Sequence, residues 1–472
     1  MKNGKATGAD DLPSEFWKLC GPSGISWLTK LLNQITAHKQ IPSAWKTSIT
    51  IPIWKEKGDI ADCSTYRPIR LTSHTLKILE RIIDARLRDI IHITDNQHGF
   101  RKGSSTTDAL HGIRLLMEKY REKNRTLHVA FLDLEKAFDT LPHSTIWFAL
   151  REHNVPEKYV NWIKMIYKDA TSRVSTSTGE TETFPVTVGV YQGSALSPLL
   201  LITVMATVTR DLQTPYLHTM LYADDVVLMA ESREELEEKV ITWKDRLTLY
   251  GLKLNTGKTE YMEFGSQTPG TISVHEPLTK ALTFKYLGSY LSHEGGVTTD
   301  VSAKIRTAWQ KWKTLTGVSC NKKLPRKLKS KVYRTVIRPA VLYGSACWAI
   351  TKKDEQRLSV METTMLRRTI GISKLEHIPN ETIRLSMGVA PIVDKVREKR
   401  LRWFGHVLRR EDNHPLKRLL LHTEIEGKRP RGRPKLRWMD KVHTDLRQLC
   451  LTPDQAHDRC TWKNITRTAD PA

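Results

Sequence analysis

The sequence predicts an α+β fold whose C-terminal third is basic and mainly helical. Two β-type segments, at 127–133 and 219–230, carry aspartates, and helix-forming segments surround them. The charge is divided unevenly, because residues 1–300 hold 36 basic and 35 acidic side chains whereas residues 301–472 hold 39 and 16. A formal net charge of +24 favours a polyanionic partner such as nucleic acid over small-molecule metabolism. A basic surface that only keeps the protein soluble is the alternative, and confinement of the charge to one third of the chain argues against it.

The elements before residue 125 follow from the spacing of apolar residues. Residues 1–60 are predicted to form a helix and then a strand at 48–54. Apolar residues at every third or fourth position predict an amphipathic helix over 75–91. A Gly- and Ser-rich loop at 99–107 leads into a further helix at 108–121.

Two β segments deliver carboxylates to their ends. Residues 127–132 form a short apolar strand that ends in Asp133. Residues 219–230 have two apolar flanks around Asp224 and Asp225, which predicts a β-hairpin with acidic residues at its tip. The following helix begins at Ser232, with Glu235 completing a capping box, and ends before Gly251.

Basic amphipathic helices follow Gly295-Gly296, so a domain boundary is expected near 295. One of these helices is expected to bury Leu328, Val332 and Val336. A second boundary is expected near 350, because residues 351–357 are polar and charged and are predicted to form a link.

The three aspartates predict a site for two Mg²⁺ ions. Hard cations prefer oxygen ligands, and Asp133 from one strand with Asp224 and Asp225 from a hairpin is an arrangement suited to in-line phosphoryl transfer. The alternative is that acidic residues in a turn are only solvated. Apolar β runs on both sides of the Asp-Asp pair weaken that alternative, since they place the pair at the edge of a core.

Several motifs together resemble a known family. Tyr222-Ala223-Asp224-Asp225 resembles the YADD box of reverse transcriptases, and Phe131–Asp139 is similar to their first catalytic motif in its non-LTR retrotransposon form. Further matching motifs follow the family's order: Tyr66–Ile69, Gly99–Thr106, Gln192–Pro198, Gly251–Asn255 with Lys258-Thr259, and Phe284–Gly288. The chain is thus identified as similar to a non-LTR (LINE-type, RTE-like) retrotransposon reverse transcriptase over essentially its whole length.

The resemblance implies a right-hand polymerase with fingers, palm and thumb. We expect fingers and palm-proximal helices at 1–120, the palm at 121–294, the thumb at 295–350 and a basic nucleic-acid-binding region at 351–472. Such elements usually carry a separate endonuclease domain ahead of the polymerase, and this chain is expected to hold the polymerase and its C-terminal region only.

The resemblance also implies roles for individual residues. Asp133, Asp224 and Asp225 would hold the metals, and Lys258 would protonate the leaving pyrophosphate, with plain surface solvation as its alternative. Phe138 would reject ribose, or else be an apolar anchor of the helix that follows the strand. The other implied roles are the binding of nucleotide by Arg67, Arg101, Gln192 and Gly193, and the primer grip, formed by Phe284, Tyr286, Leu287 and Gly288.

A basic segment near the C-terminus matches the core of an AT-hook, a minor-groove DNA-binding motif. Lys428–Lys435 contains an Arg-Gly-Arg centre, and the predicted nucleic-acid contacts are Arg429, Arg431, Arg433 and Lys435. The alternative is an extended basic connector with general affinity for phosphate.

The expected function is RNA-directed DNA synthesis by two-metal nucleotidyl transfer. By analogy with the family, the expected primer is the 3′-hydroxyl of nicked chromosomal DNA, in target-primed reverse transcription. The expected partners are template RNA, a DNA primer or target DNA, and deoxynucleoside triphosphates, with Mg²⁺ as cofactor and Mn²⁺ able to substitute. Action in the nucleus after cytoplasmic synthesis and RNA binding is expected, and no membrane role. The alternatives are a non-catalytic RNA- or DNA-binding protein derived from such an element and, third, a group II intron maturase.

Overall fold

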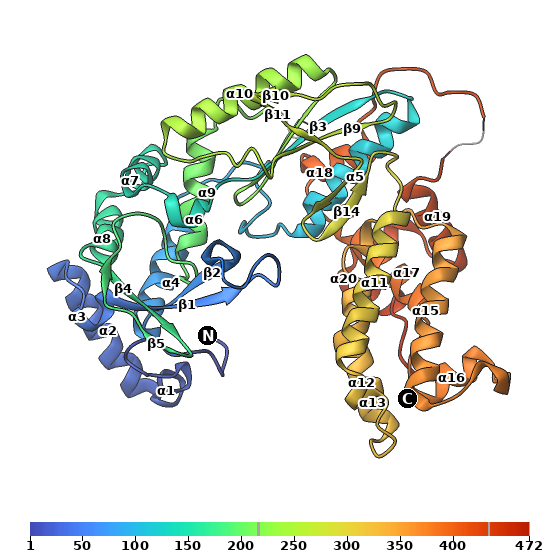
Figure 1. Ribbon diagram of the computed structural model, residues 1–472, viewed down its shortest axis with the longest axis horizontal. Helices are drawn as coiled ribbons and strands as arrows, with labels where there is room; N and C mark the ends of the chain where they lie inside the picture. Colours follow the sequence, from blue (N-terminus) through green and yellow to red (C-terminus); the bar gives the residue numbers. More distant parts are fainter. Residues whose placement is uncertain (215–217, 433–434, 472) are drawn as a thin grey trace.

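A five-stranded sheet joins the two limbs of an arch (Figure 1). The computed structural model describes residues 1–214, 218–432 and 435–471. The strand order is β12-β9-β3-β8-β7, and β3 pairs antiparallel with both β8 and β9. The strands are β3 (Leu127–Leu132), β7 (Thr219–Tyr222), β8 (Asp225–Ala230), β9 (Glu260–Phe264) and β12 (Thr279–Lys280).

Both faces of this sheet are buried. Ala130 and Leu132 of β3 belong to a cluster formed with α9 (Ser197–Val208) and α10 (Arg233–Leu249). Val129 and Phe131, which point the other way, belong to a cluster formed with α5 (Thr106–Glu122) and C-terminal helices. Burial on both sides explains why β3 is a continuous apolar run and not an alternating one.

The first limb, at the left of Figure 1, contains helices and a second sheet built on β1 (Thr47–Trp54). β1 pairs antiparallel with β2 (Tyr66–Leu71) and parallel with β4 (Thr171–Thr176). The other elements are α1 (Ser14–Leu19), α2 (Gly21–His38), α3 (Ser43–Lys46), η1 (Cys63–Thr65), α4 (His74–Arg88), α6 (Ala137–Thr140), α7 (His143–Glu152), α8 (Glu157–Tyr167), β5 (Gly179–Glu180) and β6 (Phe184–Pro185). The predicted order of helix and strand before residue 125 is therefore confirmed.

Short strands and helices complete the second limb. After α10 come β10 (Ser273–Val274), β11 (Glu276–Pro277), β13 (Thr283–Tyr286) and β14 (Ser289–Ser292). The helices are α11 (Thr298–Thr314), α12 (Thr316–Ser319), α13 (Arg326–Val332), the π-helix η2 (Tyr333–Ile337), α14 (Arg338–Val341), η3 (Ser345–Cys347), α15 (Lys352–Ile370), η4 (Lys374–Glu376), α16 (Asn380–Ser386), α17 (Ile392–Leu408), α18 (Pro415–Leu421), α19 (Trp438–Gln448), η5 (Pro453–His457) and α20 (Arg459–Ile465). Within the described ranges, no helix is long and apolar enough to cross a membrane.

The prediction of a polar link at 351–357 is wrong. These residues form the first turns of α15, and the Thr351 side chain caps the helix by accepting a hydrogen bond from the Asp354 backbone N–H. One hydrophobic cluster extends from Val297 to Val396 and crosses position 350. Lys352 and Lys353 are exposed whereas Asp354 is buried at the helix cap, so a composition that resembles that of a link belongs to the start of a helix with one buried face.

Two further details differ from the sequence-based expectation. Leu328 and Val336 are exposed, whereas Tyr333 and Ile337 are buried, so the buried face lies one position away from the predicted one. Lys329 and Tyr333 turn this face toward α15, because they donate hydrogen bonds to the Thr369 carbonyl and the Glu362 carboxylate. At α10, Ser232 accepts a hydrogen bond from the Glu235 N–H as expected, but the Glu235 carboxylate pairs with Lys239. This leaves half of the predicted capping box.

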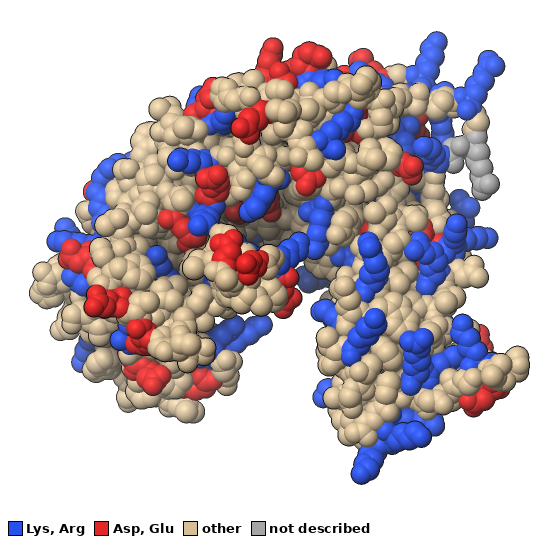
Figure 2. Space-filling model, viewed as in Figure 1, with Lys and Arg blue, Asp and Glu red and all other residues tan. Residues whose placement is uncertain are grey.

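The C-terminal helices pack on α5 behind the central sheet. Trp438 and Trp462 are each 1% exposed, and Phe404 of α17 lies in the same cluster. The indole N–H of Trp462 donates to the carbonyl of Leu401 at 2.8 Å. These tryptophans therefore anchor the core. Lys and Arg side chains gather on the outside of this limb (Figure 2).

A buried ion pair fixes α11 to α5. Arg114 and Asp300 are 2.9 Å apart with side chains 8% and 0% exposed, and Asp300 also accepts from the indole N–H of Trp348 at 2.9 Å. We expect Asp300→Ala to lower the free energy of unfolding by about 3–5 kcal/mol, because it leaves a buried guanidinium without its partner. Urea denaturation measures the loss, with exposed Asp245→Ala as control. A loss below about 1 kcal/mol would show that this pair does not anchor the limb.

Candidate active site

The three predicted aspartates lie at one edge of the central sheet. Leu132, which precedes Asp133, pairs with Val226 of β8, and Tyr222 pairs with Asp225 across the β7–β8 turn. The turn requires a left-handed backbone at Ala223, whose φ is +59°. The register therefore brings Asp133 next to the turn that carries Asp224 and Asp225.

Burial and mutual repulsion disfavour ionisation of these carboxyl groups. Burial raises the pKa of Asp225 to about 7, and the neighbouring Asp224 and Asp133 add to the shift. Burial also raises the pKa of Asp224 and that of Asp133, and Lys258 opposes the latter shift. A cluster of this kind is stabilised by a cation.

The raised pKa of Asp225 predicts that Mg²⁺ binding releases protons. At pH 7 this carboxyl group is about half protonated, and the ion binds the ionised form, so about half a proton leaves with each binding event. Calorimetry in buffers of different ionisation enthalpy measures the release, which should disappear at pH 9 and in Asp225→Asn. Equal release by parent and variant would assign the protons elsewhere.

A cavity of about 1200 Å³ adjoins the aspartates. Its lining contains six of the predicted site residues: Arg67, Asp133, Phe138, Gln192, Asp224 and Lys258. Arg67 on β2 and Phe138 on α6 come from the first limb. The aspartates come from the edge of the central sheet, so both parts of the molecule contribute to the cavity. Arg101 is absent from the described lining and pairs with Asp95 at 2.6 Å. The structure therefore does not bring Arg101 to this cavity.

Lys258 lies beside the first aspartate. Its ammonium nitrogen is 3.7 Å from Oδ2 of Asp133, and its side chain is 68% exposed. The backbone N–H of Lys258 donates to the Asn255 carbonyl, and Asn255 N–H donates to the carbonyl of Asp133 at 2.8 Å. The loop is thus tied to the end of β3, and it keeps the Lys258 ammonium group at the solvent-exposed side of Asp133.

The Gln192-Gly193 motif is fixed by contacts within the protein. The Gln192 amide donates to Asp139 at 2.8 Å. Gly193 has φ +114°, and a Cβ there would lie 2.9 Å from the carbonyl oxygen of Arg70 in β2. The close approach that glycine permits is therefore to β2, and binding of nucleotide by Gln192 and Gly193 stays a prediction.

The predicted primer grip is the β13–β14 hairpin. The ring of Phe284 stacks on Phe131 with centroids 4.0 Å apart, and Tyr286 is buried, so both anchor the hairpin. Leu287 and Gly288 form the turn with positive φ, and Leu287 accepts a hydrogen bond from the Tyr343 hydroxyl at 2.7 Å. Contact of this turn with a primer stays a prediction.

The predicted C-terminal contacts lie away from this cavity. Arg429, Arg431 and Lys435 line a different one, at the other end of the central sheet. Arg433 lies outside the described residues. Recognition of AT-rich DNA by this segment stays a prediction.

Gln97 is a site residue that the motif analysis missed. Its side-chain oxygen accepts from the backbone N–H of Ala223 at 2.8 Å, and its amide lies 3.4 Å from the Ala223 carbonyl. A Cβ on Gly99 would collide with the Ala223 nitrogen, so the glycine permits this approach. Gln97 therefore holds the backbone of the turn that carries two aspartates.

We expect Gln97→Met to lower kcat about 10- to 100-fold, because the turn loses the acceptor that fixes Ala223 while the side-chain volume is kept. Single-nucleotide primer extension measures kcat and the KM for nucleotide, and only kcat should change. Gln213→Met, which removes an amide between Thr94 and Thr209, is the control. A kcat within twofold of the parent would deny Gln97 this positioning role.

Comparison with known proteins decides the family. Residues 53–291 match the model of a family described as reverse transcriptase (RNA-dependent DNA polymerase), and this span contains all three aspartates and most of the residues that line the large cavity. The chain belongs to the reverse transcriptase family.

The similar curated proteins come from mobile elements, in agreement with the predicted non-LTR retrotransposon reverse transcriptase. The RNA-directed DNA polymerase from mobile element jockey of Drosophila melanogaster is 25% identical over 95% of this chain and 50% of its own length. The Pol polyprotein from the type-1 retrotransposable element R2 of Nasonia vitripennis is 28% identical over 62% of this chain and 30% of its own. The chain thus spans half or less of these relatives. A solved structure of telomerase from Candida tropicalis, with a fragment of telomeric RNA, aligns at 12% identity and a TM-score of 0.42 over 85% of this chain and 68% of its own.

Proposed function

We propose that this chain copies an RNA template into DNA by nucleotidyl transfer. The observation that carries the proposal is the convergence of Asp133 with Asp224 and Asp225 at one sheet edge, beside a cavity that Arg67 and Lys258 also line. Membership of the reverse transcriptase family supports RNA as the template.

The donor set fits divalent Mg²⁺. Carboxylate oxygens are the ligands that this hard cation prefers, and the three acids are destabilised as charged groups until a cation joins them. The strand register brings the three aspartates to one edge, although no three His, Cys, Asp or Glu side chains of the described residues form a metal-binding group as they lie. Bound Mg²⁺, with Mn²⁺ able to substitute, would activate the primer 3′-hydroxyl and stabilise the pyrophosphate.

The remaining residues act on substrate and leaving group. Arg67, exposed on β2, is placed to bind the triphosphate through charge-assisted hydrogen bonds. Lys258 is placed to give a proton to the pyrophosphate oxygen, because its ammonium group is beside Asp133 and open to solvent. Phe138 limits the space for the incoming sugar.

The mobile-element relatives support a wider role. The template would be element RNA, the primer a nicked DNA end in the target, and the place of action the nucleus. The substrates would be deoxynucleoside triphosphates. An RTE-like origin rests on the motifs quoted from the sequence.

Extension of oligo(dT) on poly(rA) with Mg²⁺ tests the proposal. We expect DNA synthesis that requires the metal and is lost in Asp133→Asn but kept in the exposed control Asp245→Asn. Tight template binding without synthesis under any divalent metal would favour the alternative, a non-catalytic nucleic-acid-binding protein.

A further inference from the structure

A second, basic cavity lies at the opposite end of the central sheet from the aspartates. Its volume is about 590 Å³. Phe264 lines it and pairs with Leu127, the first residue of β3, whereas Asp133 follows the last. Six residues at about 3.3 Å each place the two sites roughly 20 Å apart.

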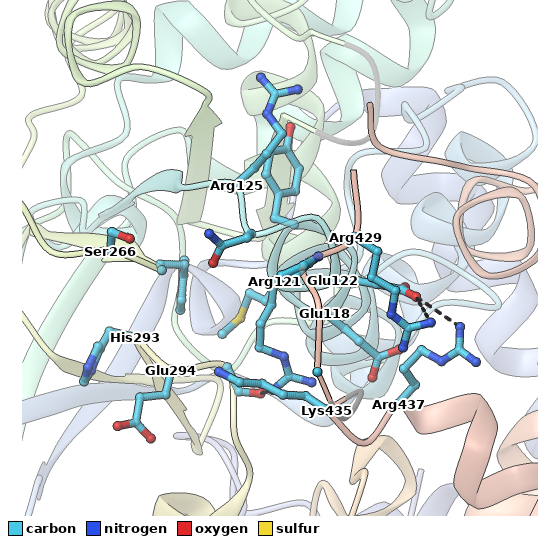
Figure 3. Close-up of a pocket in the computed structure, with 18 of the residues that line it drawn as sticks. Glu118, Arg121, Glu122, Arg125, Ser266, His293, Glu294, Arg429, Lys435 and Arg437 are labelled. Atoms are coloured by element: carbon cyan, nitrogen blue, oxygen red, sulfur yellow. Dashed lines mark hydrogen bonds and ion pairs between the residues drawn. The ribbon is translucent and has the colours of Figure 1, made fainter. Parts of the chain in front are cut away.

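Three parts of the chain form the walls (Figure 3). The end of α5 forms one wall, and the loops after β9 and β14 form the second. The third is formed by residues 429–432 and 435–437, here called the basic strap. The charged lining residues are Arg121, Arg125, Arg429, Arg431, Lys435 and Arg437, against Glu118, Glu122 and Glu294. Cations thus outnumber carboxylates two to one.

The strap is attached to α5. The backbone N–H of Trp438 donates to Glu118 at 2.7 Å, and Arg121 donates to the carbonyl of Leu436 at 3.1 Å. Arg437 and Arg429 approach Glu122 at 3.2 and 3.8 Å. The cavity is therefore a defined feature of the fold.

Several cations of this cavity have no carboxylate partner. No acidic side chain of the described residues lies within ion-pair distance of Arg431 or Lys435, and both are exposed. Arg121 donates to two backbone carbonyls, those of Gly295 and Leu436. Figure 3 shows Arg121 and Lys435 in the middle of the group, with Arg125 at its edge. Arg125 and Arg437, by contrast, are ion-paired with Glu231 and Asp440 outside the lining, so Arg431 and Lys435 are the cations available to a bound anion.

We propose that this cavity binds the phosphodiester backbone of a single nucleic acid strand, as a second contact outside the active site. Cations at alternate positions of the strap, Arg429 and Arg431, suit a ligand with repeated phosphates more than one isolated anion. The inference rests on the proposed function, because the strand is one that the polymerase copies or makes.

Salt-dependent binding tests the site. We expect the double variant Arg431→Ala with Lys435→Ala to bind a labelled 20-nucleotide RNA, and a DNA strand of the same sequence, about tenfold more weakly at 0.1 M salt. The slope of log K against log salt should fall in magnitude by about 1.4, because two phosphate contacts are lost. Anisotropy titrations of the full chain measure both. Lys30→Ala with Lys168→Ala removes the same charge from exposed positions of the first limb and should change the slope by far less.

The outcomes separate this proposal from the proposed function. Single-nucleotide addition at saturating template and primer should be unchanged in the strap variant, so loss of binding with intact chemistry supports the second site. Equal slopes for the two double variants would overturn it. If the strap variant lost affinity only for AT-rich duplex DNA, the result would overturn the proposal in favour of the minor-groove motif. Comparison of its affinities for the RNA strand and the DNA strand identifies which strand the site prefers.

A measurement on the unaltered chain adds a second check. Bound RNA should protect the Lys435 amine from acylation, followed by mass spectrometry, while exposed Lys168 stays reactive. Equal modification of Lys435 with and without saturating RNA would also overturn the proposal.

Discussion

Asp224→Asn is expected to abolish nucleotide addition, with a loss of about three orders of magnitude or more, roughly 4 kcal/mol in the barrier. The substitution keeps the volume of the side chain and removes the charge that a divalent cation requires. Asp224 is half-buried in the β7–β8 turn and lines the large cavity together with Asp133.

Template binding should persist in this variant, because the basic surface of the second limb is untouched. Burst kinetics of single-nucleotide addition measure the chemical step, and anisotropy with labelled template measures binding. Asp245→Asn, on the exposed face of α10, is the matched control and should retain full activity. Activity of Asp224→Asn within tenfold of the parent would remove Asp224 from the metal site.

Phe138→Val is expected to raise ribonucleotide incorporation by tens to hundreds of fold, on the order of 2–3 kcal/mol of lost discrimination. Phe138 is partly buried and lines the cavity that Asp133 and Gln192 also line. We expect a deoxyribose to fit beside the ring and a 2′-hydroxyl to overlap it, and close packing makes such an overlap costly.

The measurement is the ratio of kcat/KM for a ribonucleotide to that for the matching deoxynucleotide. Deoxynucleotide addition should fall only modestly. The matched control is Phe148→Val, the same substitution at an exposed position of α7, and it should leave this ratio unchanged. An active Phe138→Val variant with the parent's ratio would make Phe138 an anchor of α6 and not a sugar gate.

The catalytic edge was predictable because its signals are local. The apolar runs of β3, β7 and β8 are long enough to indicate strands, and the aspartates at their ends mark the site directly. Gln97 carried no such signal, because its role depends on contact with Ala223, 126 positions away. A single glutamine in a loop is compatible with many structures.

Other misses came from features that composition conceals. Leu328 and Val336 are exposed because the neighbouring face of the helix, with Lys329 and Tyr333, is hydrogen-bonded to α15, and the spacing of apolar residues does not show such polar contacts. Arg101 was placed with the nucleotide by its motif, yet Asp95 holds it elsewhere. The cavity under the basic strap joins residues near 120 with residues near 430, which no local pattern connects.

The shared core of α5 and the C-terminal helices restricts how such a gene can recombine. Phe404, Trp438 and Trp462 complete the same cluster as Phe131 of the catalytic strand. A chimera joined near residue 300 or 350 would combine two halves of this core from different proteins, whose side chains are not matched in shape. A chain that ended there would expose to water the face of the central sheet that carries Phe131. The polymerase and its C-terminal region therefore share one core, and we expect exchange between elements to be tolerated better in segments outside it.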